Sequence, residues 1–207
     1  DLLSRSAHKY HGPKGAGALH VRKGTQLQPL LPGGGQARGL RAGTLNVPAI
    51  VGLGAAAAIA QREMETGAAR VGALRDRLLA GLRERLVDGV IVNGPPPGEW
   101  RLPTNLNISI EWIDGSMLLP RLAPRIAVSS GSACSGVAGA SHVLRAIGRT
   151  SRQITASLRF GLGRFTTADD VDAAVDAVAD VVSGLRAIDP LYELHREGVD
   201  VRALPGE

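Results

Sequence analysis

Residues 157–185 read SLRFGLGRFTTADDVDAAVDAVADVVSGL, and the hydrophobic pattern changes its period within this stretch. At its start apolar residues alternate with polar or small ones, which is typical of a strand with one buried face. Further on, apolar residues recur every three to four positions, as along one face of a helix. Asp169 and Asp170 suit the positive N-terminal turn of that helix. The stretch predicts a strand followed by an amphipathic helix, whose apolar face carries Val171, Ala174, Val175, Val178, Val181 and Leu185.

Similar patterns surround this unit. NLNISIE at 105–111 alternates most cleanly, with Leu106, Ile108 and Ile110 on one face and polar residues on the other. Shorter strand patterns lie at 89–93 and 125–130. Because helical patterns separate these strands, we predict a small α/β sandwich domain over residues 67–207.

Residues 1–66 have a different organisation. They contain a short apolar strand at 16–21, a Gly- and Pro-rich loop at 24–46 and a helix from Val47 to Glu65. We expect Gly67 to break the helical pattern, with a second helix over 68–86. One strand is too few for an independent sheet. We therefore predict that residues 1–66 are the end of another domain and, since the chain starts without methionine, that it is a fragment.

Composition excludes several classes of protein. The 207 residues are 44% hydrophobic, enough for a real core, yet no apolar run approaches the roughly 18 residues of a membrane span. The net charge of +5 comes from arginines interleaved with acidic residues, and aromatics are only 3%, so direct nucleic-acid binding is not favoured. The single cysteine excludes an internal disulfide and fits a reducing compartment, so we expect a cytoplasmic protein without membrane association.

SAHKYHGPKGAG at 6–17 contains two of the three lysines in the chain, Lys9 and Lys14. Neighbouring positive charge and partial desolvation can lower the pKa of a lysine and make it a nucleophile. The glycines bring backbone N–H groups within reach of an anion. A lysine for a Schiff base beside phosphate donors suits pyridoxal 5'-phosphate, but spacing alone is a weak signal and favours no more than a basic surface loop.

Two residues outside this loop could also carry chemistry. Cys134 lies in SSGSACSGVAGAS, where small and polar residues dominate, so its thiolate could reach a substrate; a structural role remains the alternative. No histidine is adjacent and no metal-binding pattern surrounds it. Arg159 shares a strand face with Ser157 and Gly161. Its guanidinium, which we expect to be buried, suits a carboxylate, either of a ligand or of a protein Asp or Glu.

Six segments together resemble the pyridoxal-phosphate-dependent cysteine desulfurases of the class V aminotransferase superfamily, which have fold type I. The resemblance covers essentially the whole chain and runs in family order through SAHKYHGPKGAGALHVR, GGGQARGLRAGTLNV, NLNISI, AVSSGSACSG, SHVLRAIG and SLRFGLGRFTTADDVD. It implies that residues 1–66 are the C-terminal portion of the cofactor-binding large domain. Residues 67–207 would be the small C-terminal domain carrying the catalytic cysteine loop.

The resemblance also implies a role for individual residues. Lys9 would form the Schiff base with pyridoxal 5'-phosphate and then shuttle protons, while Ser6 and His8 would bind the cofactor phosphate. Thr44 would reach the phosphate bound in a neighbouring subunit, which implies a homodimer. The two remaining roles belong to Arg159, which would hold the carboxylate of L-cysteine, and to Cys134, the nucleophile.

The implied reaction converts L-cysteine to L-alanine and leaves a persulfide on Cys134. The sulfur would pass to an acceptor protein in iron–sulfur cluster assembly, tRNA thiolation or DNA phosphorothioation. Three alternatives stay open: a selenocysteine lyase, an aminotransferase-like relative, and a non-catalytic docking module. In the family, the full chain has a further half of the large domain before the position that corresponds to Asp1. We therefore expect this chain to bind the cofactor poorly without that half.

Overall fold

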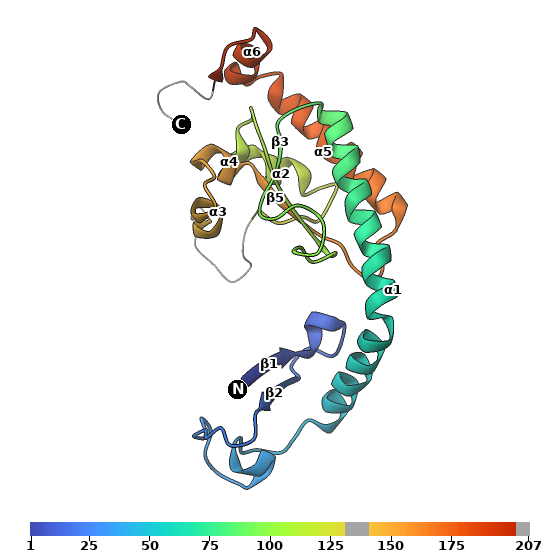
Figure 1. The fold of residues 1–207 in the computed structure, drawn as a ribbon, viewed down its shortest axis with the longest axis vertical. Helices are drawn as coiled ribbons and strands as arrows, with labels where there is room; N and C mark the ends of the chain where they lie inside the picture. The colour runs from blue at the N-terminus through green and yellow to red at the C-terminus, as the bar shows by residue number, and fades with distance from the viewer. Residues whose placement is uncertain (131–140, 202–207) are drawn as a thin grey trace. The chain divides into compact units, whose positions relative to one another are not determined.

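The computed structural model describes residues 1–130 and 141–201, and the chain divides into two compact units, Asp1–Thr66 and Gly67–Glu207. The elements of both units appear as a ribbon in Figure 1. Helices and strands are mixed throughout, in agreement with the predicted α/β class.

The first unit contains a two-stranded antiparallel sheet. Strand β1 (Leu2–Ser6) pairs with β2 (Gly17–Val21), and the 3-10 helix η1 (Ala7–Tyr10) follows β1 directly. The strand β2 was predicted, whereas β1 was missed because it holds only two apolar residues, and its first four residues are exposed. A second 3-10 helix, η2 (Gln36–Gly39), interrupts the long loop.

This first unit has almost no core of its own. Within residues 1–66, all of which the structure describes, only Ala7 is buried. Large apolar side chains are exposed instead, among them Leu3, Leu19 and Val51. A two-stranded sheet without a covered apolar face is marginal in water.

Helix α1 (Val47–Leu86) is a single continuous helix, so the predicted break at Gly67 is wrong. A helical glycine costs only about 1 kcal/mol relative to alanine, and the good helix formers on both sides can offset this cost. The start of α1 is capped by Asn46, whose Oδ1 accepts a hydrogen bond from the N–H of Ala49 at 3.2 Å.

The second unit is built on a three-stranded antiparallel sheet in the order β3–β4–β5. The strands are β3 (Val90–Val92), β4 (Asn105–Ile110) and β5 (Ser157–Gly161). The strand expected over 125–130 is reduced to one bridge between Ser129 and Arg159, which extends the sheet beside β5. Thus the predicted strands at 89–93 and 105–111 are present, and the third is not.

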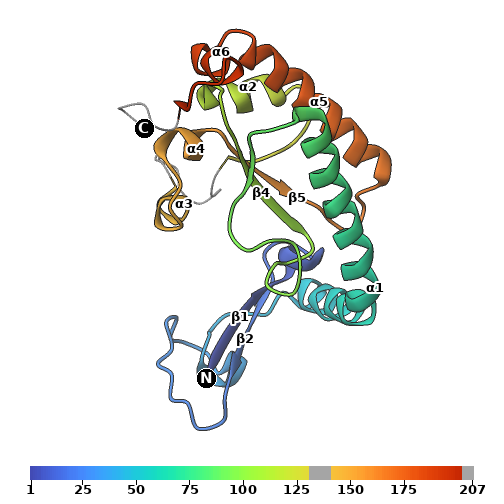
Figure 2. The same cartoon turned by 45° about the horizontal axis from the view of Figure 1, so that its top comes forward.

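One face of this sheet forms the core together with two long helices. Leu106, Ile108 and Ile110 of β4 and Leu158 and Phe160 of β5 are buried against apolar residues of α1 and of α5 (Ala168–Arg186). Figures 1 and 2 show α1 and α5 side by side. The predicted apolar face of α5 is confirmed, because its valines and leucine belong to this core or pack against it.

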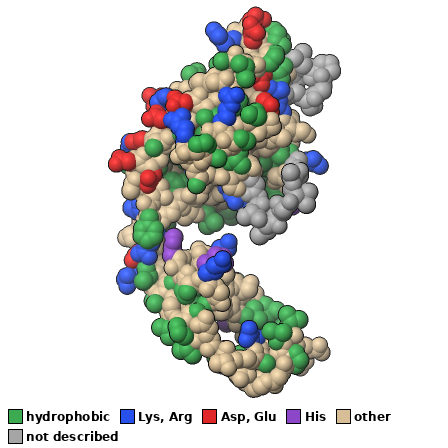
Figure 3. Space-filling model, turned by 180° about the vertical axis from the view of Figure 1, so that it is seen from behind, with side chains coloured by type: hydrophobic (Ala, Val, Ile, Leu, Met, Phe, Trp, Pro, Cys, Tyr) green, Lys and Arg blue, Asp and Glu red, His purple; other side chains and the backbone are tan. Residues whose placement is uncertain are grey.

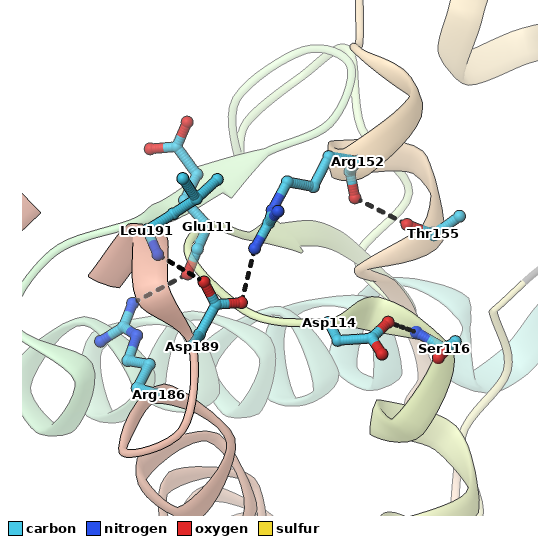
Figure 4. A network of polar contacts seen from close by, with 8 residues as sticks. All are labelled: Glu111, Asp114, Ser116, Arg152, Thr155, Arg186, Asp189 and Leu191. Carbon is cyan, nitrogen blue, oxygen red and sulfur yellow. Dashed lines mark hydrogen bonds and ion pairs between the residues drawn. The ribbon is translucent and has the colours of Figure 1, made fainter. Parts of the chain in front are cut away.

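Short helices complete the second unit: η3 (Gly115–Met117), α2 (Leu118–Leu122), α3 (His142–Ala146), α4 (Ser151–Thr155) and α6 (Pro190–Arg196). Asp189 caps α6 by accepting a hydrogen bond from the N–H of Leu191 at 2.9 Å, and it also pairs with Arg152 of α4. Figure 4 shows these contacts, with Arg186 reaching the carbonyl of Glu111 nearby. The helix α6 is therefore tied to the body of the unit by polar contacts.

Ion pairs follow the exposed side of the two long helices. Arg77 pairs with Asp172, and Arg85 pairs with Asp176. The face of residues 67–201 drawn in Figure 3 accordingly shows acidic and basic side chains interleaved, as the sequence predicted. Across the described ranges, no helix is long and apolar enough to cross a membrane.

Candidate cofactor and substrate sites

The turn that follows β1 holds Ser6, His8 and Lys9 together. Ser6 is the residue before η1, and its Oγ lies 3.0 Å from Nδ1 of His8. Lys9 is exposed in the same 3-10 helix. The predicted cofactor residues of this loop thus form one polar group at the end of a strand.

The backbone of this turn is fixed by the hydrogen bonds of a buried alanine. Ala7 is fully buried, its N–H donates to the carbonyl of Ala16 at 3.0 Å, and its own carbonyl accepts from the N–H of Gly12 at 2.9 Å. A side chain at Gly12 would contact both Cβ and O of Ala7 at 3.0 Å, so glycine allows this close approach. His11 closes the turn with a left-handed φ of 67°.

These residues fit a cofactor that carries an aldehyde and a phosphate. A primary amine is available on Lys9, and the hydroxyl of Ser6 and the imidazole of His8 can serve a phosphate. The segment Ser6–Gly17 contains no Asp or Glu that would repel an anion. The set of side chains is therefore chemically suitable for pyridoxal 5'-phosphate.

Thr44 lies in the same unit, three residues before the start of α1, and is exposed. Among residues 1–66 no hydrogen bond joins it to Ser6, His8 or Lys9. The neighbouring turn is set by Gly43, which has a φ of 105° and donates its N–H to Oε1 of Gln36 at 3.2 Å. The role of Thr44 toward another subunit stays a prediction.

Arg159 lies in β5 of the second unit, opposite Asn107 of β4 in the strand register. Its side chain is exposed, which corrects the expectation of a buried guanidinium, and it donates to Oγ of Ser129 at 3.3 Å. No Asp or Glu within residues 1–130 and 141–201 forms an ion pair with it. The structural ion pair considered from the sequence is therefore not found in this part of the chain.

Cys134 lies outside the described residues. The part of the chain that the structure does describe contains no cluster of His, Cys, Asp or Glu that could hold a metal ion.

A buried polar network on the sheet was missed by sequence reasoning. Asn93, Ser109 and Ser157 are buried, and their side chains are hydrogen-bonded to one another. The signal was present in NLNISI, because the polar face of that strand carries Asn and Ser in place of the Lys and Glu that a solvent-facing strand would favour.

Comparison with known proteins defines the class of this chain. The family model described as aminotransferase class-V, a family of pyridoxal-phosphate-dependent enzymes, matches residues 1–174. The chain belongs to this family.

Within the family, the chain is similar to proteins named cysteine desulfurase. It is 47% identical to cysteine desulfurase IscS of Methylococcus capsulatus over 99% of this chain and 50% of the relative. It is 48% identical to the mitochondrial cysteine desulfurase of Arabidopsis thaliana over 97% of this chain and 44% of the relative. The chain thus spans about half the length of the curated relatives it matches.

Solved structures give the same result for the fold. A NifS-like protein superposes with a TM-score of 0.77 and 38% identity, covering 89% of this chain and 47% of that one. DndA from Streptomyces lividans superposes with a TM-score of 0.61 and 36% identity, covering 78% and 46%. The predicted fold-type I architecture is confirmed by these neighbours.

Proposed function

We propose that this chain is the C-terminal half of a cysteine desulfurase that converts L-cysteine to L-alanine and retains the sulfur as a persulfide on Cys134. The observation that carries the proposal is the 47% identity, along nearly the whole chain, to a protein named cysteine desulfurase. In this proposal, residues 1–66 end the cofactor-binding domain and residues 67–207 form the small domain.

Each site residue has one task in the proposed reaction. Lys9 Nζ holds the cofactor and moves the proton at the substrate Cα, and Ser6 and His8 hold the phosphate. Pyridoxal 5'-phosphate, when bound, supplies the electron-withdrawing ring that makes this proton acidic. Arg159 orients the substrate through its carboxylate, for which its guanidinium is the best-matched partner.

Cys134 then takes the sulfur. Its thiolate attacks the sulfur of the substrate, the substrate C–S bond breaks, and its electron pair remains on carbon, which is protonated to give the methyl group of alanine. The sum is L-cysteine plus the Cys134 thiol giving L-alanine plus the Cys134 persulfide, so atoms and electrons balance. The persulfide sulfur passes to an acceptor protein.

The proposed assembly is a cytoplasmic homodimer in which Thr44 of one subunit reaches the cofactor phosphate of the other. The exposed apolar side chains of residues 1–66 support a surface that further polypeptide covers. The acceptor remains open between an iron–sulfur scaffold, a tRNA-thiolation protein and a DNA phosphorothioation complex.

Replacing Cys134 with serine tests the reaction. In the full-length enzyme loaded with pyridoxal 5'-phosphate, Cys134→Ser should reduce alanine formation from L-cysteine to background, because no thiolate remains to take the sulfur. Alanine release at the full rate would reject the desulfurase mechanism and favour a relative that does not need this cysteine. Failure of the unsubstituted protein to bind the cofactor at all would favour the docking module.

A further inference from the structure

The face of the β3–β4–β5 sheet opposite the hydrophobic core carries one row of polar residues. Asn93 follows β3 and donates its N–H to the carbonyl of Asn107 in β4 at 2.9 Å. Asn107 is directly opposite Arg159 in β5, and Arg159 is bridged to Ser129. Residues directly opposite one another in an antiparallel pair point their side chains to the same face. Asn107 and Arg159 are therefore neighbours on this face.

The orientation of the Asn93 amide is fixed by an arginine. Nε of Arg149 lies 2.6 Å from Oδ1 of Asn93, and a guanidinium can only donate hydrogen bonds. The atom of Asn93 that faces Arg149 must therefore be the oxygen. The amide nitrogen of Asn93 must in turn face β4.

The other end of the network agrees with this orientation of the Asn93 amide. Oγ of Ser157 donates to the carbonyl of Gln153 at 2.7 Å, so its single proton is used. Ser157 must then accept from Oγ of Ser109 at 2.9 Å, and Ser109 in turn accepts from Nδ2 of Asn93 at 2.9 Å. Oγ of Ser109 also donates to Oδ1 of Asn93 at 3.3 Å, which the same orientation of the Asn93 amide allows. The donor-only guanidinium at one end and the carbonyl at the other thus agree on this orientation.

The consequence appears at Asn107. Nδ2 of Asn93 also donates to Oδ1 of Asn107 at 2.7 Å, so Nδ2 of Asn107 is turned away from Asn93 with two N–H donors. Within residues 1–130 and 141–201, Nδ2 of Asn107 has no hydrogen-bond acceptor, and Oγ of Ser129 is the side-chain acceptor that Arg159 has. This face of the sheet therefore carries an amide and a guanidinium, both donors, at directly opposite positions of β4 and β5.

We propose that Asn107 is a specificity-determining residue that donates, together with Arg159, to the α-carboxylate of the amino-acid substrate. The inference rests on the proposed function, in which Arg159 binds that carboxylate. A carboxylate has two oxygens that only accept, which suits two adjacent donors. Arg149 and Asn93 do not touch the substrate. They act as positioning residues that fix the Asn107 amide with its Nδ2 turned away from Asn93.

The test uses the isosteric substitution Asn107→Asp in the full-length enzyme loaded with pyridoxal 5'-phosphate. The aspartate can still accept from Asn93, but it replaces the two donors by a charged oxygen beside Arg159. The KM for L-cysteine should rise about 10- to 100-fold with kcat little changed, because a binding interaction is lost in ground and transition state alike. Asn107→Ala, which adds no charge, should raise KM in the same direction by about tenfold.

A binding measurement makes the test independent of turnover. The dissociation constant of L-alanine, measured by calorimetry, should rise by the same factor in Asn107→Asp, whereas that of ethylamine, which lacks the carboxylate, should not change. The matched control is Asn105→Asp, on the same strand and face but opposite Gly161, where the new charge would meet Arg101, which already donates to Oδ1 of Asn105 at 3.1 Å. This control should bind L-alanine as the unsubstituted enzyme does.

Two results would overturn the inference, and they are distinguishable. Equal effects of Asn107→Asp and Asn105→Asp, or no effect of either, with Arg159→Ala still weakening L-alanine binding, would remove Asn107 from the site and leave the proposed function intact. Unchanged L-alanine binding in Arg159→Ala would reject the assignment of Arg159 in the proposed function, and the role of Asn107 with it.

Discussion

Lys9 is the single residue on which the proposed cofactor site depends most. Arginine stays protonated at neutral pH and cannot form a covalent bond with an aldehyde in this way, so this position requires lysine if the cofactor is bound there. The structure places Lys9 exposed beside the Ser6–His8 hydrogen bond. Its neighbour Lys14 has the same chemistry but lies beyond Gly12 in the exposed turn to β2.

The first prediction compares these two lysines. Lys9→Ala should abolish the visible absorbance of the covalently bound cofactor in the full-length enzyme, and Lys14→Ala should retain it. Borohydride reduction of the unsubstituted enzyme followed by peptide mass spectrometry should find the cofactor attached to Lys9. Attachment to Lys14, or unchanged absorbance in Lys9→Ala, would show that the assignment is wrong.

At the residue scale, the sequence predicted those site residues whose proximity is determined by their spacing along the chain. Ser6, His8 and Lys9 lie within one turn, so their proximity follows from the chain itself. Asn107 could not be found in this way, because its orientation is set through Asn93 and then Arg149, which is 56 residues beyond Asn93. The exposure of the Arg159 side chain likewise depends on where the sheet ends, and the sequence of a single strand does not reveal the extent of the sheet.

At the scale of elements, α1 shows the limit of glycine as a helix breaker. Gly67 and Gly81 both lie inside this helix with helical backbone. A Cβ at Gly67 would meet nothing within 4 Å, whereas one at Gly81 would lie 2.9 Å from Cγ2 of Val175 in α5. The same residue type therefore serves two purposes, and the sequence alone does not distinguish them.

The second prediction uses this pair of glycines. Gly67→Ala should stabilise the protein by about 0.5–1 kcal/mol, because alanine loses less backbone entropy in a helix. Gly81→Ala should destabilise it by about 1–3 kcal/mol, because the methyl group overpacks the contact between α1 and α5. Urea unfolding followed by circular dichroism measures both. A destabilising Gly67→Ala would contradict a continuous α1.

The start of α5 is stabilised by a capping box between Thr167 and Asp170. Oγ1 of Thr167 accepts from the N–H of Asp170 at 3.1 Å, and Oδ2 of Asp170 accepts from the N–H of Thr167 at 2.9 Å and from its hydroxyl at 2.8 Å. These hydrogen bonds, the backbone one first, lower the pKa of Asp170. Because the folded pKa is depressed, the contribution to stability is present above the unfolded value of about 3.9 and is lost as pH falls through the folded pKa.

The third prediction follows from the lowered pKa of Asp170 in the folded state. Asp170→Asn should lower the melting temperature at neutral pH, and the difference from the unsubstituted protein should shrink below about pH 4, where the aspartate itself becomes protonated. Melting curves at a series of pH values measure this. Asp169→Asn removes the same charge from the same helical turn without touching the box, and an identical pH dependence in this control would assign the effect to net charge instead.

At the scale of the whole molecule, the two units differ in how they are stabilised. Among the described residues, the main hydrophobic cluster runs from Val71 to Leu185, and α1, α5 and the sheet supply most of it. Alternating strands and the helix over 168–186 made this part predictable, because its periodicity reflects its own core. The β1 strand was not predictable in this way, since its leucines are exposed in the structure.

The account as a whole predicts that sulfur from L-cysteine ends on Cys134. Because the chain contains one cysteine, a persulfide in this half can form at that position alone. The direct measurement is peptide mass spectrometry of the full-length, cofactor-loaded enzyme after brief incubation with L-cysteine without reductant, alongside quantified alanine. We predict that the Cys134 peptide gains the mass of one sulfur atom, with one alanine formed for each sulfur retained. Alanine formation with an unmodified Cys134 peptide would contradict the account.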